Sequence, residues 1–209
     1  MASHRPKQPS CLSEFEHINR YWDQANNTWT AKILPGEYYV TTQQDEAIAT
    51  TLGSCVSACI RDTVFGIGGM NHFMLPTQSE HAGNSWMDSA TRYGSFAMEH
   101  LINDILKKGG NWNNLEVKLT GGGKIMANMN DVGAKNIKFV LEYLQTENLD
   151  IIAQDLGDTF PRKVLYYPIT GRLRVKKLRK LHNDTLIQRE QAYQDELSVQ
   201  PDSGGVELF

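Results

Sequence analysis

Residues 50–59 read TTLGSCVSAC, and residues 68–72 a little further along the chain read GGMNH. The first stretch contains a Gly-Ser-Cys turn that leads into a strand. It predicts the thiol of Cys55 at the end of a structural element, with free backbone N–H groups nearby. The second stretch is a glycine-rich strand that ends in His72. A cysteine and a histidine at such positions are the residue types that acyl transfer requires.

The spacing of the two stretches predicts how the cysteine and the histidine meet. Suppose that residues 55–62 and 65–75 form a hairpin closed by Thr63 and Val64. The numbers of directly opposed residues then add up to 127, so Cys55 faces His72. Directly opposed residues hold their Cβ atoms about 4.5–5.5 Å apart, close enough for a thiolate–imidazolium pair. The prediction depends on this register, because a slip of one residue places the two side chains on opposite faces.

Three other interpretations of these residues stay open. A strand cysteine is often structural, since free cysteine is among the most buried residue types. His72 has apolar neighbours and fits a core histidine equally well. A metal site of Cys55, Cys59 and His72 is disfavoured, because four residues along a strand separate the two cysteines by about 13 Å. We therefore expect Cys59 in the core, Cys11 in the N-terminal region, and neither a metal nor a cofactor.

The pattern of apolar residues along the rest of the chain predicts an α+β domain over residues 36–181, with packed mixed β-sheets flanked by helices. Helices are expected at residues 88–108 and 132–147, where apolar residues recur every three or four positions. Residues 1–35 are expected to be a loose extension with one helix near residues 13–24, and residues 182–209 a polar helix followed by a flexible tail. Strands are expected at residues 37–41, 47–51, 55–61, 65–75, 115–119, 150–156, 163–169 and 172–178.

Composition excludes several classes of protein. The chain has 209 residues, 22% of them charged, and a formal net charge of -3, so nucleic acid is not an expected partner. No stretch approaches the roughly 18 apolar residues of a membrane-spanning helix, and the first ten residues lack the apolar centre of a secretory signal. Three cysteines are too few for a disulfide scaffold. We expect a cytoplasmic protein with free thiols and no membrane insertion.

Two further motifs each have a structural and a functional interpretation. Residues 121–124, GGGK, lack the longer spacing of a phosphate-binding loop. We favour a tight turn near the hairpin, where Gly121 and Gly122 let a substrate backbone approach closely. Residues 172–180 hold six basic side chains on an expected strand. They form either the solvated face of an edge strand, which is favoured, or a stripe that docks acidic helices.

Taken together, the motifs resemble those of the CheD family of chemoreceptor glutamine deamidases. The resemblance spans about residues 35–181 and implies an α+β fold of the cysteine-hydrolase-like type. Its motifs occur in the order of that family: LGSCVSAC at residues 52–59, GMNHFMLP at 69–76, Tyr93, LTGGG at 119–123, Asn136, DLG at 155–157, PRKV at 161–164 and TGR at 170–172.

The resemblance implies a reaction and a catalytic triad. Members of that family convert selected receptor glutamines to glutamates with a Cys–His–Thr triad, and Cys55 and His72 match its first two members. The threonine lies a few residues before the cysteine, where this chain has Ala49, Thr50 and Thr51. We assign this role to Thr50, which would orient the imidazole ring.

The resemblance also implies a substrate and partners. Gly53 and Ser54 are expected to bind the substrate, through backbone N–H groups that receive the developing oxyanion. The implied partners are the cytoplasmic helices of methyl-accepting chemotaxis receptors and a CheC-type phosphatase. The alternative function is a receptor-binding adaptor that regulates such a phosphatase without catalysis. A thiol hydrolase acting on another amide or ester is a further alternative.

Overall fold

The computed structural model describes residues 6–76, 85–125, 132–179 and 184–199. Among these residues, none of the helices has both the length and the apolar content to cross a bilayer. The helices are α1 (Ser85–Lys107), α2 (Val132–Thr146) and α3 (Asp184–Val199), with short 3-10 turns η1 (Ser13–Phe15) and η2 (Trp112–Asn114). The strands are β1 (Asn19–Asp23), β2 (Thr28–Lys32), β3 (Tyr38–Thr41), β4 (Glu46–Leu52), β5 (Val56–Asp62), β6 (Ile67–Asn71), β7 (Leu115–Gly121), β8 (Ile151–Leu156), β9 (Arg162–Tyr167) and β10 (Arg172–Lys177).

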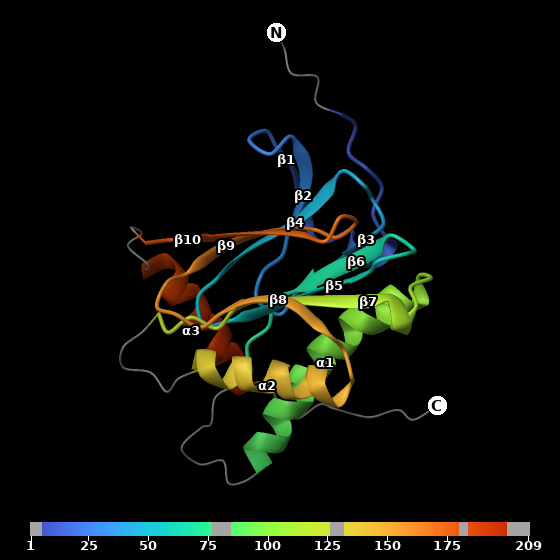
Figure 1. The fold of residues 1–209 in the computed structure, drawn as a ribbon. Coiled ribbons are helices and arrows are strands. Elements are labelled where there is room, and N and C mark those ends of the chain that lie inside the picture. Colours follow the sequence, from blue (N-terminus) through green and yellow to red (C-terminus); the bar gives the residue numbers. More distant parts are fainter. Residues whose placement is uncertain (1–5, 77–84, 126–131, 180–183, 200–209) are drawn as a thin grey trace.

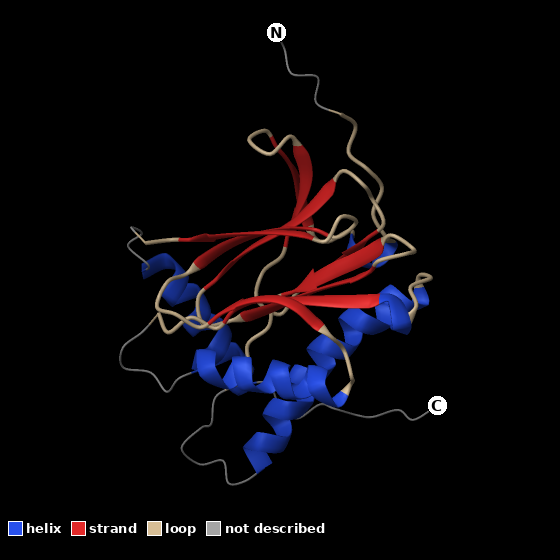
Figure 2. Ribbon diagram, viewed as in Figure 1, coloured by secondary structure: helices blue, strands red, loops and turns tan. Residues whose placement is uncertain are grey.

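Two five-stranded sheets lie one over the other, and α1 and α2 cover the outer face of the second sheet (Figure 1, Figure 2). The first sheet has the order β1-β2-β4-β9-β10, and the second has the order β3-β6-β5-β7-β8. The β2–β4 and β7–β8 pairs are parallel, and the other pairs are antiparallel. The predicted α+β class with mixed sheets is confirmed.

The region before residue 36 differs from the expected loose extension. Residues 19–32 form the hairpin β1–β2, and β2 joins the first sheet beside β4. The Asp23 carboxylate accepts a hydrogen bond of 3.1 Å from the Asn26 backbone N–H in the turn, and Trp22 pairs across the hairpin with Trp29. The predicted helix near residues 13–24 is wrong, because cross-strand pairing of these aromatic residues organises the segment as strands.

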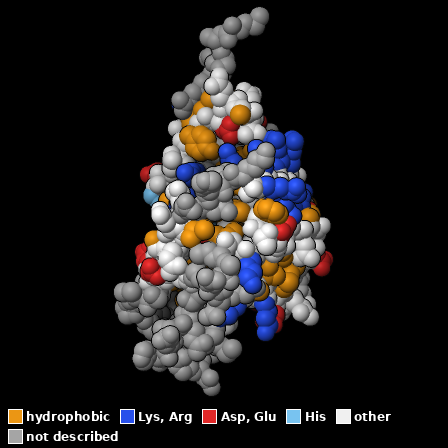
Figure 3. Space-filling view, turned by 90° about the vertical axis from the view of Figure 1, so that its left-hand side faces the viewer, with side chains coloured by type: hydrophobic (Ala, Val, Ile, Leu, Met, Phe, Trp, Pro, Cys, Tyr) orange, Lys and Arg blue, Asp and Glu red, His pale blue; other side chains and the backbone are white. Residues whose placement is uncertain are grey.

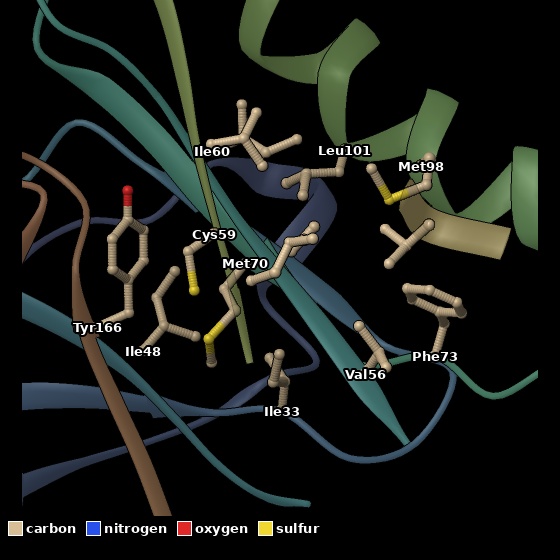
Figure 4. Close-up of a cluster of buried hydrophobic side chains, with 14 of the residues drawn as sticks. Ile33, Ile48, Val56, Cys59, Ile60, Met70, Phe73, Met98, Leu101 and Tyr166 are labelled. Carbon is tan, nitrogen blue, oxygen red and sulfur yellow. The ribbon is translucent and has the colours of Figure 1, made fainter. Parts of the chain in front are cut away.

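The core has two parts, one between the sheets and one under α1. Cys59 of β5 points into the space between the sheets, beside Ile48 and Tyr166 of the first sheet (Figure 4). Val56 and Ile60 of the same strand point toward α1 (Figure 4). Side chains alternate between the two faces of a strand, so Cys59 lies on the opposite face of β5 from Val56 and Ile60. The face that carries Cys59 is directed at the first sheet. Cys59 is fully buried, as expected.

The β5–β6 hairpin has a different register from the predicted one. Asp62 pairs with Ile67, so the numbers of opposed residues add up to 129 rather than 127. The turn comprises residues 63–66, because the Asp62 carboxylate accepts hydrogen bonds from two of its backbone N–H groups, at 2.7 Å each. Gly66 supplies the positive φ of 79° that this turn requires. The slip is two residues rather than one, so every side chain keeps its expected face.

The basic run of residues 172–180 begins on an edge strand. β10 lies at the end of the first sheet, where Arg172, Arg174 and Lys176 are exposed and alternate with half-buried residues. Lys and Arg side chains also gather on one flank of the molecule in Figure 3. The edge-strand interpretation is therefore confirmed, while a docking role for these residues stays a prediction.

Glu46 links β4 to its neighbours, and its replacement is expected to destabilise the fold. Its fully buried carboxylate accepts hydrogen bonds from Arg20 at 2.7 Å, Tyr39 at 2.9 Å and Thr41 at 2.7 Å. Glu46→Ala leaves the Arg20 charge buried without its partner, which should lower the free energy of unfolding by about 3–5 kcal/mol. Guanidinium denaturation measures this loss. The control is Glu142→Ala, whose side chain is 65% exposed. A loss no larger than that of the control would contradict the prediction.

Candidate active site

Thr50 and His72 meet between the two sheets. Thr50 lies in β4 of the first sheet, and His72 directly follows β6 of the second. Thr50 Oγ1 lies 2.9 Å from the carbonyl oxygen of Ile33 and 2.7 Å from Nδ1 of His72. A carbonyl can only accept, so the single hydroxyl proton goes to Ile33, and Thr50 accepts from an N–H at Nδ1. This hydrogen-bond pattern assigns the imidazole proton to Nδ1 and leaves a lone pair on Nε2.

The His72 ring is buried, and its backbone is fixed on the β3 side. The Gly36 N–H donates to the His72 carbonyl at 2.8 Å, and the His72 N–H donates to the Glu37 carbonyl at 2.9 Å. Nε2 is buried and has no hydrogen-bond partner among the residues that the structure describes. Burial, followed by the positive charge of Arg189, lowers the pKa of His72 to about 3. The ring is therefore neutral at physiological pH, with an unprotonated lone pair on Nε2.

Cys55 lies just before β5, on the strand pair that also carries His72. Val56 and Phe73 form an antiparallel bridge with two backbone hydrogen bonds of 3.0 Å. Cys55 and His72 each precede one of these bridged residues, so they occupy diagonal positions on one face rather than directly opposed ones. Diagonal neighbours on paired strands are about 7–8 Å apart, and Cys55 is not a hydrogen-bond partner of Nε2 of His72 in the described part of the chain. The expected pairing by direct opposition is corrected, but both residues share the face toward the first sheet.

The turn before Cys55 directs two backbone N–H groups at one point. The N–H groups of Gly53 and Ser54 both donate to Oε1 of Glu190, at 2.8 Å and 3.1 Å, and the Ser54 N–H is shared with Oε2 at 2.9 Å. Two N–H groups that converge on one oxygen are the arrangement that stabilises an oxyanion in acyl transfer. The backbone donors expected at Gly53 and Ser54 are therefore present, and their role in substrate binding stays a prediction.

The side chain bound by these two N–H groups is that of Glu190, which was not predicted as a site residue. Glu190 lies in α3, more than 130 residues from the cysteine turn, and its side chain is buried. Its Oε2 also accepts from the Ser54 hydroxyl at 2.7 Å. Burial raises the pKa of the Cys55 thiol well above its usual range, and the charge and a hydrogen bond of Glu190 raise it further. The cysteine is thus held as a neutral thiol beside a carboxylate.

Gly121 and Gly122 lie beside the cysteine turn but face the chain's own backbone. The Gly122 N–H donates to the Cys55 carbonyl at 2.7 Å, and the Gly123 N–H donates to the Gly53 carbonyl at 2.7 Å. A Cβ on Gly121 would collide with the Cys55 carbonyl oxygen, and its φ of 118° also favours glycine. These buried glycines hold the turn in place. Their expected role in substrate binding stays a prediction.

Asn136 of α2 connects the two halves of the site. Its buried side chain donates to the Ser54 carbonyl at 2.9 Å and accepts from the Leu75 N–H at 2.9 Å. One amide thus fixes the cysteine turn and the segment that follows His72. From the sequence, Asn136 is only a motif residue, because its partners are 61 and 82 residues away and no local signal indicates them.

A small cavity of about 70 Å³ lies beside His72, lined among others by Gly36, Tyr93 and Phe96. A cavity of this size accommodates water. Within the described ranges, no group of three or more His, Cys, Asp and Glu residues is arranged to hold a metal ion.

Comparisons with known proteins agree with the resemblance seen in the motifs. A family model described as CheD chemotactic sensory transduction matches residues 74–177. A protein of Halorhodospira halophila named probable chemoreceptor glutamine deamidase CheD is 54% identical over 96% of this chain and 94% of its own length. This chain belongs to the CheD family.

Other comparisons give the same family or a weaker likeness. A Hahella chejuensis protein with the same name is 51% identical to this CheD protein over 100% of the chain and 99% of its own length. A crystal structure of a Neisseria meningitidis protein of family model DUF152 has a TM-score of 0.38 and 11% identity, over 59% of this chain and 54% of that one. The family assignment therefore rests on the sequence relatives.

Proposed function

We propose that this CheD protein is a protein-glutamine deamidase, which converts glutamine side chains of chemoreceptors to glutamate and releases ammonia. The observation that carries the proposal is the Thr50–His72 hydrogen bond of 2.7 Å, which leaves Nε2 free as a base on the face that carries Cys55. The converging N–H groups of Gly53 and Ser54 add an oxyanion site. The names of the relatives agree with this chemistry.

The first half of the proposed reaction forms a thioester. Nε2 of His72 takes the proton of the Cys55 thiol, and the thiolate attacks the side-chain carbonyl carbon of the substrate glutamine. The developing oxyanion is bound by the N–H groups of Gly53 and Ser54, each contributing about 3 kcal/mol. The imidazolium then protonates the amine, which leaves as ammonia, and the acyl group remains on sulfur.

The second half returns the enzyme to its starting state. His72 removes a proton from a water molecule, which attacks the thioester carbonyl under the same N–H groups. Cys55 leaves as the thiolate, takes the proton back from His72, and the substrate is released as glutamate. The cavity beside His72 is the proposed source of the water. The overall reaction consumes one water per amide, so we propose no cofactor.

We propose Thr50 as the positioning residue of the triad. Thr50→Val keeps the shape of the side chain but removes its hydrogen bond to Nδ1, which frees the ring to rotate. We expect kcat to fall about tenfold or more, the equivalent of one lost hydrogen bond, with KM unchanged. Thr50→Ser restores the hydroxyl and should recover most of kcat in a steady-state ammonia-release assay. An equal loss in both variants would assign the effect to packing instead.

The proposal extends to location and partners. The substrates are the helical cytoplasmic regions of methyl-accepting chemotaxis receptors, and the reaction takes place in the cytoplasm. A CheC-type phosphatase is proposed as a further partner, and neither nucleic acid nor membrane insertion is part of the proposal. The alternative is an adaptor that binds the receptor and regulates the phosphatase without catalysis.

Mass spectrometry of a receptor cytoplasmic fragment tests the function. The fragment is incubated with the wild-type protein or with Cys55→Ala, digested, and searched for glutamines that have become glutamates. We expect conversion at a small number of positions, and only with the wild-type protein. Binding of the fragment without conversion by either protein would contradict the deamidase and favour the adaptor.

A further inference from the structure

The carboxylate of Glu190 occupies the position that the proposed reaction assigns to the substrate. A glutamate side chain held by the N–H groups of Gly53 and Ser54 has the chemical form of the reaction product. We propose that α3 is a built-in product analogue, which fills the docking site of a glutamine-bearing substrate helix and keeps the enzyme closed until such a helix displaces it. This inference rests on the proposed function and names the surface where the substrate helix binds.

The buried face of α3 is unlike that of a helix held by core packing. Such a helix buries a stripe of apolar side chains. The fully described buried side chains of α3 are Glu190, Gln194 and Leu197, so a carboxylate and a carboxamide lie inside. Gln194 Nε2 has no hydrogen-bond partner within the described part of the chain. Two of these three buried side chains thus have the chemical form of a glutamine deamidase's product and substrate, while Tyr193 packs partly buried against the core.

The pocket around the Glu190 side chain suits an amide as well as an acid. Oε1 accepts from the N–H groups of Gly53 and Ser54, and the Ser54 N–H also donates to Oε2 at 2.9 Å; a carboxamide oxygen at the Oε1 position would keep the first two bonds and give up the third. The Ser54 hydroxyl donates to Oε2 at 2.7 Å, but a hydroxyl can also accept a hydrogen bond from a carboxamide N–H. The same three groups can therefore bind glutamine before the reaction and glutamate after it.

Two glycines allow α3 to approach both catalytic side chains. A Cβ on Gly53 would lie 2.7 Å from Oε1 of Glu190, and a Cβ on Gly36 would lie 2.7 Å from the hydroxyl oxygen of Tyr193. Gly36 is hydrogen-bonded to the backbone of His72, and the Tyr193 hydroxyl also hydrogen-bonds to that of Tyr93 in α1. α3 thus contacts the cysteine side of the site through Glu190 and the histidine side through Tyr193.

The docked helix also suppresses the reactive ionisation state. Burial and the Glu190 charge raise the pKa of Cys55, while burial and the Arg189 charge lower the pKa of His72. Both directions disfavour the thiolate–imidazolium pair. Removal of α3 takes away both charges, so the active form is the one in which a substrate helix has replaced α3.

The sharpest test converts the product analogue into a substrate. In Glu190→Gln, the Cys55 thiolate attacks the side-chain carbon of the introduced carboxamide, ammonia leaves, and water hydrolyses the thioester to restore glutamate. Lys-C, which cleaves after Lys180, releases the peptide 181–209 for mass spectrometry. We expect most molecules to carry glutamate at position 190, and only glutamine when Cys55→Ala is added. Gln188, Gln191 and Gln194 in the same peptide should stay amides and serve as internal controls.

A second arm measures the closed state without self-conversion. Glu190→Ala removes the charge-assisted hydrogen bonds that hold α3, so both receptor deamidation and alkylation of Cys55 by iodoacetamide should be about tenfold faster than in the wild type. Glu196→Ala is the matched control, because it removes an exposed carboxylate from the same helix. Its two rates should equal those of the wild type.

The outcomes separate this inference from the proposed function. If the wild type deamidates receptors while Glu190→Gln keeps its amide at position 190 and Glu190→Ala gains nothing, the inference is wrong and the function stands. Self-conversion of Glu190→Gln without conversion of receptors supports the inference and overturns the receptor substrate. If neither is converted, alkylation decides: faster alkylation of Cys55 in Glu190→Ala supports occupation by α3, and equal rates overturn it.

Discussion

Cys55→Ala is expected to abolish glutamine deamidation while leaving the fold and receptor binding intact. The proposed reaction passes through a thioester on this sulfur, and no other thiol adjoins the N–H groups of Gly53 and Ser54 in the described part of the chain. Removal of the nucleophile from such a set of residues lowers kcat by about 10⁴-fold or more. Ammonia release with a receptor fragment measures the loss, and denaturation curves measure the stability.

Cys59→Ala is the matched control for this variant. Cys59 is also fully buried, four residues further along the same chain segment, and lies in the core between the sheets. We expect the control to lose some stability through the small cavity and to keep its kcat. Wild-type turnover by Cys55→Ala would contradict the assignment of the nucleophile.

His72→Asn is expected to lower kcat by about 10³-fold, because general acid and base catalysis of both half-reactions is lost. The amide nitrogen of asparagine can still donate toward Thr50, but the side chain has no basic atom at the position of Nε2. KM should change little, since the proposed substrate contacts are to Gly53 and Ser54. Steady-state kinetics measure the two constants separately.

The control for the histidine variant is His17→Asn, at an exposed position far from β6 in the chain. Its kcat should equal that of the wild type. A rise in KM with an unchanged kcat in His72→Asn would assign the histidine to substrate binding rather than to proton transfer. That result would contradict the mechanism.

Much of the fold from residue 37 onward could be predicted from local patterns. Apolar and polar residues alternate in β7, and apolar residues recur every four positions in α1. Both patterns lie within a short stretch of sequence, so the positions of these two elements could be predicted from them. The β1–β2 hairpin was missed because its strands mix polar residues with Tyr and Trp, and because β2 buries side chains on both faces. The Asp23–Asn26 turn contact was the available signal, since Asp and Asn at these spacings favour turns.

The register of the β5–β6 hairpin could not be predicted from local sequence alone. Thr63 and Val64 are poor residues for a two-residue loop, and the chain uses a longer turn that reaches Gly66. The longer turn shifts the pairing by two residues. Because side chains alternate with a period of two, the face shared by Cys55 and His72 was predicted correctly even though their direct opposition was not.

The parts of the site that could not be predicted are the long-range contacts. Thr50 was assigned through the resemblance, and its contact to His72 depends on how two separate sheets stack. Glu190 reaches Gly53 across 137 residues, and nothing in the polar sequence of α3 indicates which of its carboxylates enters the site. Such contacts depend on tertiary packing, which no local pattern in a single sequence specifies.

Covalent trapping of Cys55 tests the central claim most directly. A receptor-derived helical peptide is made with its target glutamine replaced by the chloromethyl ketone analogue, so that attack by a thiolate displaces chloride and forms a stable thioether. We predict one equivalent of label per protein, located on Cys55 by peptide mapping, with much slower labelling in His72→Asn and none at Cys59 or Cys11. Label at another residue, or no label while receptor deamidation continues, would contradict the proposed mechanism.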